Sequence, residues 1–275
     1  MICIAHLSDL HFGRADPDLR APLLEAVNGA RPDVVAISGD LTQRARSAQF
    51  REASAFIDEI EAPVVIVPGN HDIPLDRPLS RLIAPFAGYR RHISLDLQPK
   101  FVSDEVAVAG INTVTRFAWQ SGHVKRRALK RLCTVFGGDP ERLNVVVAHH
   151  PLEQAPEVRK SPTRGAHAAI DTLSGCGADI LLTGHLHTWH AGPIITRPEG
   201  GRILQIHAGT GLSTRLRGQE NDFALLKVDK PDLTLERWVA GPDRLRFAPA
   251  DVRYFRQEHS GWSEATPKTA SRAAR

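Results

Sequence analysis

Short runs of valine, isoleucine and leucine recur along the first 190 residues and alternate with longer amphipathic stretches. The apolar runs are ICIAHLSD, DVVAISGD, PVVIVPGNHD, LNVVVAHHP and ADILLTGHLH. A strand that is apolar at nearly every position is expected where both faces of its sheet are covered. We therefore predict that each run forms a buried strand.

Two of the stretches between these runs have the periodicity of amphipathic helices. The first spans residues 18–29 and the second spans residues 47–60. Strands that alternate with helices indicate an α/β fold. The apolar faces comprise Leu19, Leu23, Leu24 and Val27 in the first helix and Phe50, Ala53, Phe56, Ile57 and Ile60 in the second.

The chain changes character after about residue 203, where ILQIHAGTG, FALLKVDK and LTLERWVAG follow one another with little helix between them. These segments predict a second, mostly antiparallel sheet. We place the main domain at residues 1–243 and treat residues 244–275 as a C-terminal extension. The distal part, SEATPKTASRAAR, has no periodicity and little apolar content, so we expect it to be disordered.

Composition refines this picture only slightly. A chain of 275 residues with 42% hydrophobic content buries a full core, and one large domain is the default. The net charge of +4 is spread along the chain, which suits a phosphate-bearing substrate without identifying one. Cys3, Cys133 and Cys176 stand far apart, so we expect reduced thiols. With no basic leader and no apolar run long enough to span a bilayer, we expect a cytoplasmic protein without a membrane association.

Every predicted strand in the first 190 residues ends in polar side chains that bind metals in other proteins. In open α/β sheets, ligand sites lie beyond the carboxyl ends of the strands, so residues remote in sequence converge there. Taken singly, each motif is better explained as a turn or a solvated strand edge. Taken together, they favour a metal site. In chain order the polar residues are Asp9 and His11, Asp40, Asn70 with His71 and Asp72, His149 and His150, and His185 and His187.

The number and type of these donors indicate more than one ion. Imidazole nitrogens mixed with carboxylate and amide oxygens suit Fe, Mn, Zn or Co better than Ca or Mg alone. One ion does not use so many donors, whereas two ions about 3.5 to 4 Å apart with a bridging carboxylate do. We therefore predict a dinuclear centre.

The motifs also carry a family resemblance. DLH at 9–11, GD at 39–40, GNHD at 69–72, HHP at 149–151 and GHLH at 184–187 resemble, in order, the five motifs of the calcineurin-like metallophosphoesterases. The later string AGTGLSTRLRGQENDFALLKVD resembles the corresponding region of bacterial cyclic-nucleotide and glycerophosphodiester phosphodiesterases in that family. The resemblance implies two stacked mixed β-sheets flanked by helices, in four layers. It also implies two divalent transition-metal ions, which we take as Mn, Fe or Zn.

The same resemblance assigns roles to the motif residues. Family members with an H-x-P pattern use the first histidine as the ligand, so His149 is preferred to its neighbour. His71 matches the family's proton donor to the leaving oxygen, and Asp72 is a candidate to orient its ring or hold its proton. By the resemblance, the first ion is bound by Asp9, His11 and His187, the second by Asn70, His149 and His185, and Asp40 bridges both.

Candidate substrate contacts rest on weaker signals. His150, Arg215 and His207 are candidates to face the phosphate. A packing role explains His150 equally well, and surface or packing roles are favoured for Arg215 and His207. Trp119 is a candidate for base stacking, with a core or interface role favoured. We assign His6 to the core, and His190 to the substrate side or the surface.

The resemblance and the chemistry together predict hydrolysis of a phosphodiester, of the cyclic-nucleotide or glycerophosphodiester type, by in-line attack of a metal-held hydroxide. Gln43 stands where purple acid phosphatases carry a tyrosine, so tyrosinate ligation is not expected. A phosphomonoesterase, or a non-catalytic regulator that binds metal or nucleotide, is the alternative. We expect a small phosphodiester as the partner and no stable nucleic-acid complex, and a homodimer stays open.

Overall fold

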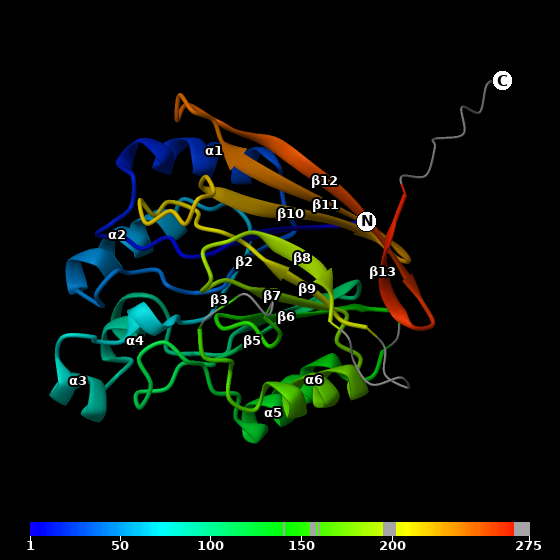
Figure 1. The fold of residues 1–275 in the computed structure, drawn as a ribbon, viewed down its shortest axis with the longest axis horizontal. Coiled ribbons are helices and arrows are strands. Elements are labelled where there is room, and N and C mark those ends of the chain that lie inside the picture. Colours follow the sequence, from blue (N-terminus) through cyan, green and yellow to red (C-terminus); the bar gives the residue numbers. More distant parts are fainter. Residues whose placement is uncertain (140, 155–157, 159, 195–201, 267–275) are drawn as a thin grey trace.

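Two β-sheets are stacked face to face, with helices on both outer faces (Figure 1). The computed structural model describes residues 1–139, 141–154, 158, 160–194 and 202–266. This arrangement confirms the four-layer fold that the motifs imply. Among the described residues, no helix has the length and apolar character that crossing a bilayer requires.

The first sheet has seven strands and contains both ends of the described chain. The three strands β1, β2 and β3 run parallel, and the remaining four continue from β1 in antiparallel pairs. In sheet order they are β13 (Gly261–Ala265), β12 (Phe247–Glu258), β11 (Asp232–Ala240), β10 (Asp222–Asp229), β1 (Ile2–Leu7), β2 (Val34–Ile37) and β3 (Val64–Ile66).

The second sheet has six strands. Its four central strands are parallel, and an antiparallel strand closes each edge. In sheet order they are β4 (Lys100–Val102), β5 (Val106–Ile111), β6 (Leu143–Ala148), β7 (Ile180–Thr183), β9 (Leu204–His207) and β8 (His190–Pro193).

Helices cover the outer faces of both sheets. On the first sheet lie α1 (Arg20–Gly29) and α2 (Ser47–Ile57), which match the two predicted helices to within a few residues. On the second sheet lie α5 (Arg126–Phe136) and α6 (Ala166–Gly175), side by side in Figure 1. The shorter elements are the 3-10 turns at Pro17–Leu19 and Asn70–Asp72 and the helices α3 (Pro78–Ile83) and α4 (Ala87–His92).

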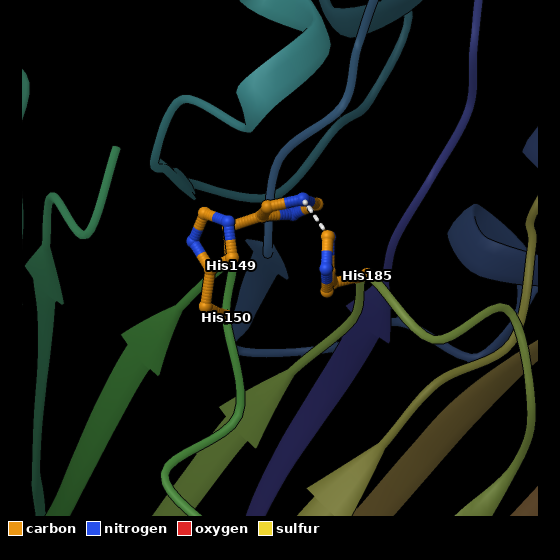
Figure 2. Close-up of side chains that lie close together, drawn as sticks. All are labelled: His149, His150 and His185. Carbon is orange, nitrogen blue, oxygen red and sulfur yellow. Dashed lines mark hydrogen bonds between the residues drawn. The ribbon is translucent and has the colours of Figure 1, made fainter. Parts of the chain in front are cut away.

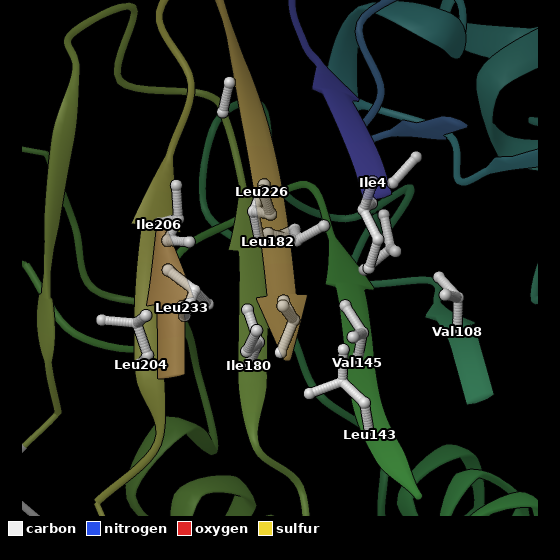
Figure 3. Packing of buried hydrophobic residues seen from close by; sticks show 14 of the residues in the cluster. Ile4, Val108, Leu143, Val145, Ile180, Leu182, Leu204, Ile206, Leu226 and Leu233 are labelled. Atoms are coloured by element: carbon white, nitrogen blue, oxygen red, sulfur yellow. The ribbon is translucent and has the colours of Figure 1, made fainter. Parts of the chain in front are cut away.

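The largest part of the core lies between the two sheets (Figure 3). Ile4 and Leu226 of the first sheet pack there against Val145 and Leu182 of the second. These strands also bury their other faces against helices, which explains why nearly every position in them is apolar. The sandwich therefore holds the carboxyl ends of both sets of parallel strands in fixed positions.

The expectation of a separate second sheet built from the later strands is wrong. β10 pairs with β1 and so extends the first sheet, whereas β9 pairs with β7 in the second. Each sheet therefore combines early and late segments of the chain. Local composition shows that a segment is a strand, but the strand's neighbour depends on long-range packing.

The segment after residue 243 forms two strands of the first sheet, β12 and β13, over most of its described length. Phe255 and Trp262 point into the core and are 1% and 0% exposed. Alternate positions carry charges that are partly exposed, such as Arg253, which pairs with Glu264. Because polar and apolar residues alternate in a half-buried antiparallel strand, the segment has a polar average composition and was not recognised as a strand. Residues 267–275, in the distal part predicted to be disordered, lie outside the described residues.

Two of the three cysteines form a disulfide, so the expectation of reduced thiols is wrong for them. Cys133 of α5 bonds Cys176, which directly follows α6, with their Cα atoms 5.5 Å apart. Only Cys3 is free. The two partners are 43 residues apart in sequence, and only the parallel packing of α5 and α6 brings them together.

Candidate metal centre

The loops that follow five parallel strands meet at one edge of the sandwich. Backbone hydrogen bonds join them: Asp9 N donates to Gly39 O at 3.0 Å, and Gly184 N donates to His149 O at 3.1 Å. All seven predicted metal ligands lie at this edge and are at most 5% exposed. The fold therefore brings together every residue that the motifs nominate.

Four of these residues form a first cluster: Asp9, His11, Asp40 and His187. The Nε2 atoms of His11 and His187 lie 3.2 Å apart, and Asp9 Oδ1 is 3.2 Å from His187 Nε2 and 3.5 Å from His11 Nε2. Asp40 Oδ2 is 3.7 Å from His11 Nε2. Four donor atoms thus surround one small volume.

A second cluster adjoins the first. His149 Nε2 lies 3.1 Å from Asn70 Oδ1, 3.3 Å from His185 Nδ1 and 3.4 Å from Asp40 Oδ2. Figure 2 shows His149 and His185 meeting from the ends of β6 and β7. Asp40 Oδ2 therefore faces both clusters, as a bridging carboxylate oxygen would.

His150 belongs to the second cluster as well (Figure 2). Its ring centroid is 4.6 Å from that of His185. Its Nδ1 is 2.7 Å from the hydroxyl oxygen of Thr113, while its Nε2 is buried with no hydrogen-bond partner among the described residues. The ring is thus held in place with one nitrogen free for a ligand.

Hydrogen bonds orient three of the candidate metal ligands, Asp9, His149 and His187, so that one atom of each faces the clusters. Asp9 Oδ2 accepts from Ser8 Oγ and His185 N, which leaves the buried Oδ1 without a donor. His149 Nδ1 donates to Ser38 O at 2.8 Å, and His187 Nδ1 donates to Arg215 O at 3.1 Å. Histidines that bind metals through one nitrogen commonly donate the other to a carbonyl in this way.

The donor set fits two metal ions. Atoms bound to one ion at about 2.1 Å lie roughly 3 to 3.5 Å from one another, close to the separations seen in both clusters. Burying this many carboxylate and imidazole groups without a cation would leave Asp9 Oδ1 unsatisfied. We conclude that the residues present suit a dinuclear centre with Asp40 in the shared position.

The electrostatics agree with this arrangement. Burial alone would raise the pKa of Asp9 and Asp40, but the histidines around them hold both well below the ordinary value. Burial lowers the pKa of His149, and Asp40 outweighs that effect and raises it to about 9. Both carboxylates are therefore ionised, and metal binding would displace a proton from His149.

The backbone of these loops is unusual. Asp9, His11, Asp40, His185 and His187 all have positive φ, between 50° and 71°. Such left-handed conformations cost a non-glycine residue about 1 to 2 kcal/mol each, and they cluster at functional sites. The preceding Gly184 has no room for a side chain, because a Cβ there would collide with Ser8 Oγ and Asp9 Oδ2. These loop conformations direct the side chains toward one point, and they lower local stability.

His71 lies beside the clusters and lines a cavity. Its ring centroid is 4.9 Å from that of His11, its Nδ1 donates to Gln43 O at 2.9 Å, and its Nε2 is 3.5 Å from Arg215 Nη1. Burial lowers the pKa of His71, although Asp40 opposes that effect. Because Nδ1 is held by a carbonyl, Nε2 is the atom available to a substrate.

Asp72 does not hold the His71 ring, so the suggested pairing between them is wrong. Its carboxylate accepts from Leu41 N at 3.1 Å, Thr42 N at 2.8 Å, Thr42 Oγ1 at 3.0 Å and Gly69 N at 2.9 Å. Burial and the nearby Asp40 raise the pKa of Asp72 to about 6. Asp72 thus ties the loop after β2 to the loop after β3.

The predicted substrate contacts separate into two groups. Arg215 lines a cavity of about 720 Å³ that opens beside His71 and Asn70. His207 instead lies at the end of β9, where its Nδ1 is 2.6 Å from Thr183 Oγ1 and its Nε2 is 3.1 Å from Gln205 Nε2. Both of its nitrogens are engaged within the protein.

Several residues of the site were not identified from the sequence. Lys160 donates from Nζ to His185 O at 2.5 Å, and burial lowers its pKa to about 8. Thr113 positions His150. Arg14 and Arg44 line the cavity, and their position a few residues after the DLH and GD motifs was the one available signal.

Comparison with known proteins agrees with this geometry. A "probable cyclic nucleotide phosphodiesterase" of Rhodococcus erythropolis is 26% identical over 206 residues, which cover 67% of this chain and 64% of that protein. The "glycerophosphodiester phosphodiesterase GpdQ" of Enterobacter lignolyticus is 31% identical over 80 residues, which cover 25% and 29%. Both matches span less than two thirds of the relative's length.

The fold resembles that of solved metallophosphoesterases. A purple acid phosphatase from yellow lupin (Lupinus luteus) superposes with a TM-score of 0.66 at 14% identity, covering 91% of this chain and 53% of the lupin chain. At that identity the likeness supports the fold alone. The family model of the calcineurin-like phosphoesterases matches residues 3–189, which contain all five motifs. The chain therefore belongs to the calcineurin-like phosphoesterase family.

Proposed function

We propose that the protein is a metal-dependent phosphodiesterase that uses two divalent transition-metal ions, Mn, Fe or Zn. The observation that carries this proposal is the position of Asp40 Oδ2, which lies 3.7 Å from His11 Nε2 in one cluster and 3.4 Å from His149 Nε2 in the other. A single oxygen shared in this way is what a pair of adjacent ions requires.

Each cluster supplies the ligands of one ion. Asp9, His11 and His187 would hold the first, and the second cluster would hold the other. We retain His149 as a ligand because its Nε2 faces both Asn70 Oδ1 and Asp40 Oδ2. His150 presents its unpartnered Nε2 nearby and is placed to contact a phosphoryl oxygen.

When bound, such ions provide a nucleophile at neutral pH and neutralise phosphoryl charge. The protein must then protonate the leaving oxygen. His71 is suited to that role in its imidazolium form, because Nδ1 then donates to Gln43 O while Nε2 carries the transferable proton on the side of the cavity. The Arg215 guanidinium, 3.5 Å from Nε2, would hold the leaving group close to that proton.

The substrate class rests on the relatives' names and on the cavity. Both reported relatives are named as phosphodiesterases, one for cyclic nucleotides and one for glycerophosphodiesters. A diester places a second organic group on the scissile phosphate, and the cavity beside His71 offers space for it. A phosphomonoesterase and a non-catalytic regulator are the competing functions.

The His71→Ala variant tests the proposal, with the exposed His167→Ala variant on α6 as a matched control. Rates with bis(p-nitrophenyl) phosphate and p-nitrophenyl phosphate would be measured after loading with Mn²⁺, Fe²⁺ or Zn²⁺. We expect a preference for the diester and a fall in kcat of about 10² to 10⁴ in His71→Ala, with metal content unchanged. Turnover of the monoester alone would favour a phosphomonoesterase, and absence of turnover with bound metal would favour a regulator.

A further inference from the structure

The cavity beside His71 has a strongly basic wall formed by Arg14, Arg44 and Arg215. Among the described residues, no aspartate or glutamate lines this cavity, and no ion pair joins any of the three arginines to a carboxylate. The nearby Arg46 and Arg77, in contrast, both pair with Asp76. The cavity arginines therefore carry charge that the protein itself does not neutralise.

The backbone holds two of these arginines next to each other. The loop after β1 and the loop after β2 run parallel, with Phe12 N donating to Leu41 O at 2.8 Å and Gln43 N donating to Phe12 O at 3.0 Å. Each loop passes from its metal-binding carboxylate into the arginine, at Arg14 and Arg44. The two side chains are thus displayed from neighbouring loops rather than from flexible tails.

A third loop joins the same wall. Thr214 N donates to Arg14 O at 2.8 Å, which places Arg215 beside the first loop. Arg215 Nη1 is also 3.4 Å from Gln43 Oε1. Three segments that are far apart in sequence therefore build one cationic surface on the side of the centre where His71 would protonate the leaving group.

An aromatic side chain lies on the lining of the same cavity. Trp119 is 65% exposed, and the Arg81 guanidinium carbon is 5.7 Å from the centroid of its ring. Arg81 also donates to Arg116 O and Ala118 O, which holds the loop that carries Trp119. An exposed tryptophan that is held in place is a stacking surface for a planar base.

We propose that the natural substrate is a linear phosphodiester whose leaving group is itself a nucleotide, with its phosphate bound by Arg14 and Arg44 and its base on Trp119. This inference rests on the proposed function. A cyclic nucleotide carries its only anionic group at the scissile position, so it would leave both arginines without an anion. The cavity volume of about 720 Å³ lies within the range of about 300 to 1,000 Å³ typical of ligand pockets.

The test compares dinucleotides that differ only in a terminal phosphate. ApA, its 5′-phosphorylated form pApA and its 3′-phosphorylated form ApAp cover a leaving group on either side of the scissile phosphate. With the Mn²⁺-loaded enzyme we expect kcat/KM at least about tenfold higher for one phosphorylated form than for ApA, since a charge-assisted contact is worth about that much. In Arg14→Gln and Arg44→Gln this ratio should fall toward one, while the exposed Arg51→Gln on α2 should keep it.

A binding measurement separates recognition from turnover. Calorimetric titration of chelator-treated protein with adenosine, with 5′-AMP and with 3′-AMP should show tighter binding of the AMP that matches the preferred dinucleotide, weakened about tenfold in Arg14→Gln. Trp119→Ala should weaken all three ligands alike. Equal rates for all three dinucleotides, no turnover of any of them, or equal losses on ApA and on the preferred phosphorylated form in the arginine variants would overturn the inference. If the parent protein still hydrolyses bis(p-nitrophenyl) phosphate in those cases, the proposed phosphodiesterase function stands. If the parent protein does not hydrolyse it, both the proposed function and this inference fail.

Discussion

Buried histidines occur in two regions of this protein, and they differ in what surrounds them. His187, in the loop after β7, and His207, at the end of β9, are 5% and 2% exposed. His187 Nε2 faces His11 Nε2 and Asp9 Oδ1, whereas both nitrogens of His207 are engaged by Thr183 and Gln205. Both rings are thus buried to a similar degree. Only the ring of His187 directs a nitrogen at other candidate metal ligands.

Backbone conformation separates the two regions as well. His187 has a φ of 59° and lies beyond the end of its strand, while His207 is paired with Thr183 inside the sheet. A strand points successive side chains to opposite faces, so it does not gather donors from several segments at one point. Loops at the carboxyl edge of the sheets do gather them. What distinguishes the metal centre is therefore the convergence of side chains from several loops, rather than burial or residue type.

The largest effect is expected where the two clusters share an atom. Asp40→Asn removes the charge of the carboxylate that both clusters share. Substituting a residue that only hydrogen-bonds to a metal ligand already lowers metal affinity about 10- to 100-fold. For the shared ligand itself we expect a loss of more than about a hundredfold. Elemental analysis after metal loading and dialysis measures the effect. Asp179→Asn, a change to a buried carboxylate paired with Lys230, is the control and should retain the metal. Equal metal content in both variants would contradict the dinuclear assignment.

A smaller effect is expected for Asp72, which lies at the same edge but bonds to backbone. In Asp72→Asn, an amide NH₂ would replace one carboxylate oxygen that now accepts hydrogen bonds from backbone N–H groups, and those bonds would be lost. We therefore expect the free energy of unfolding to fall by about 2 to 3 kcal/mol. Urea unfolding with a chelator present measures this change. A variant of unchanged stability with an altered pH–rate profile would instead support the catalytic role suggested by sequence.

The smallest effect is expected for a histidine inside a sheet. Burial lowers the pKa of His207 to about 3, against 6.5 for an ordinary histidine. The ring is therefore neutral in the folded protein but protonates when unfolded, so stability is lost as pH falls below about 6.5. Between pH 7.5 and 5.5, His207→Gln should lose about 1.4 kcal/mol less than the parent protein, as followed by urea unfolding at each pH. Parallel curves for the two proteins would show that folding does not lower the pKa of His207.

The order of motifs identified most of the centre in advance. Asp9, Asp40 and the pair His149 and His150 could be named because each follows an apolar run that predicts a buried strand, and parallel strands present their carboxyl ends at one edge. The preference for His149 within that pair rested on the family resemblance. The helices α1 and α2 could be predicted from their periodicity, because that pattern depends only on local helix geometry.

Tertiary structure alone decided the features that depend on contacts between remote segments. The bond between Cys133 and Cys176, the division of the late strands between two sheets, and the backbone bonds of Asp72 all join segments whose spacing in sequence carries no signal. The sequence by itself determined which side chains end the strands, because apolar patterning and turn chemistry are local. Which of those side chains share an ion, line the cavity or only hold two loops together was decided by packing, since distances between residues far apart in sequence arise only when the sheets stack.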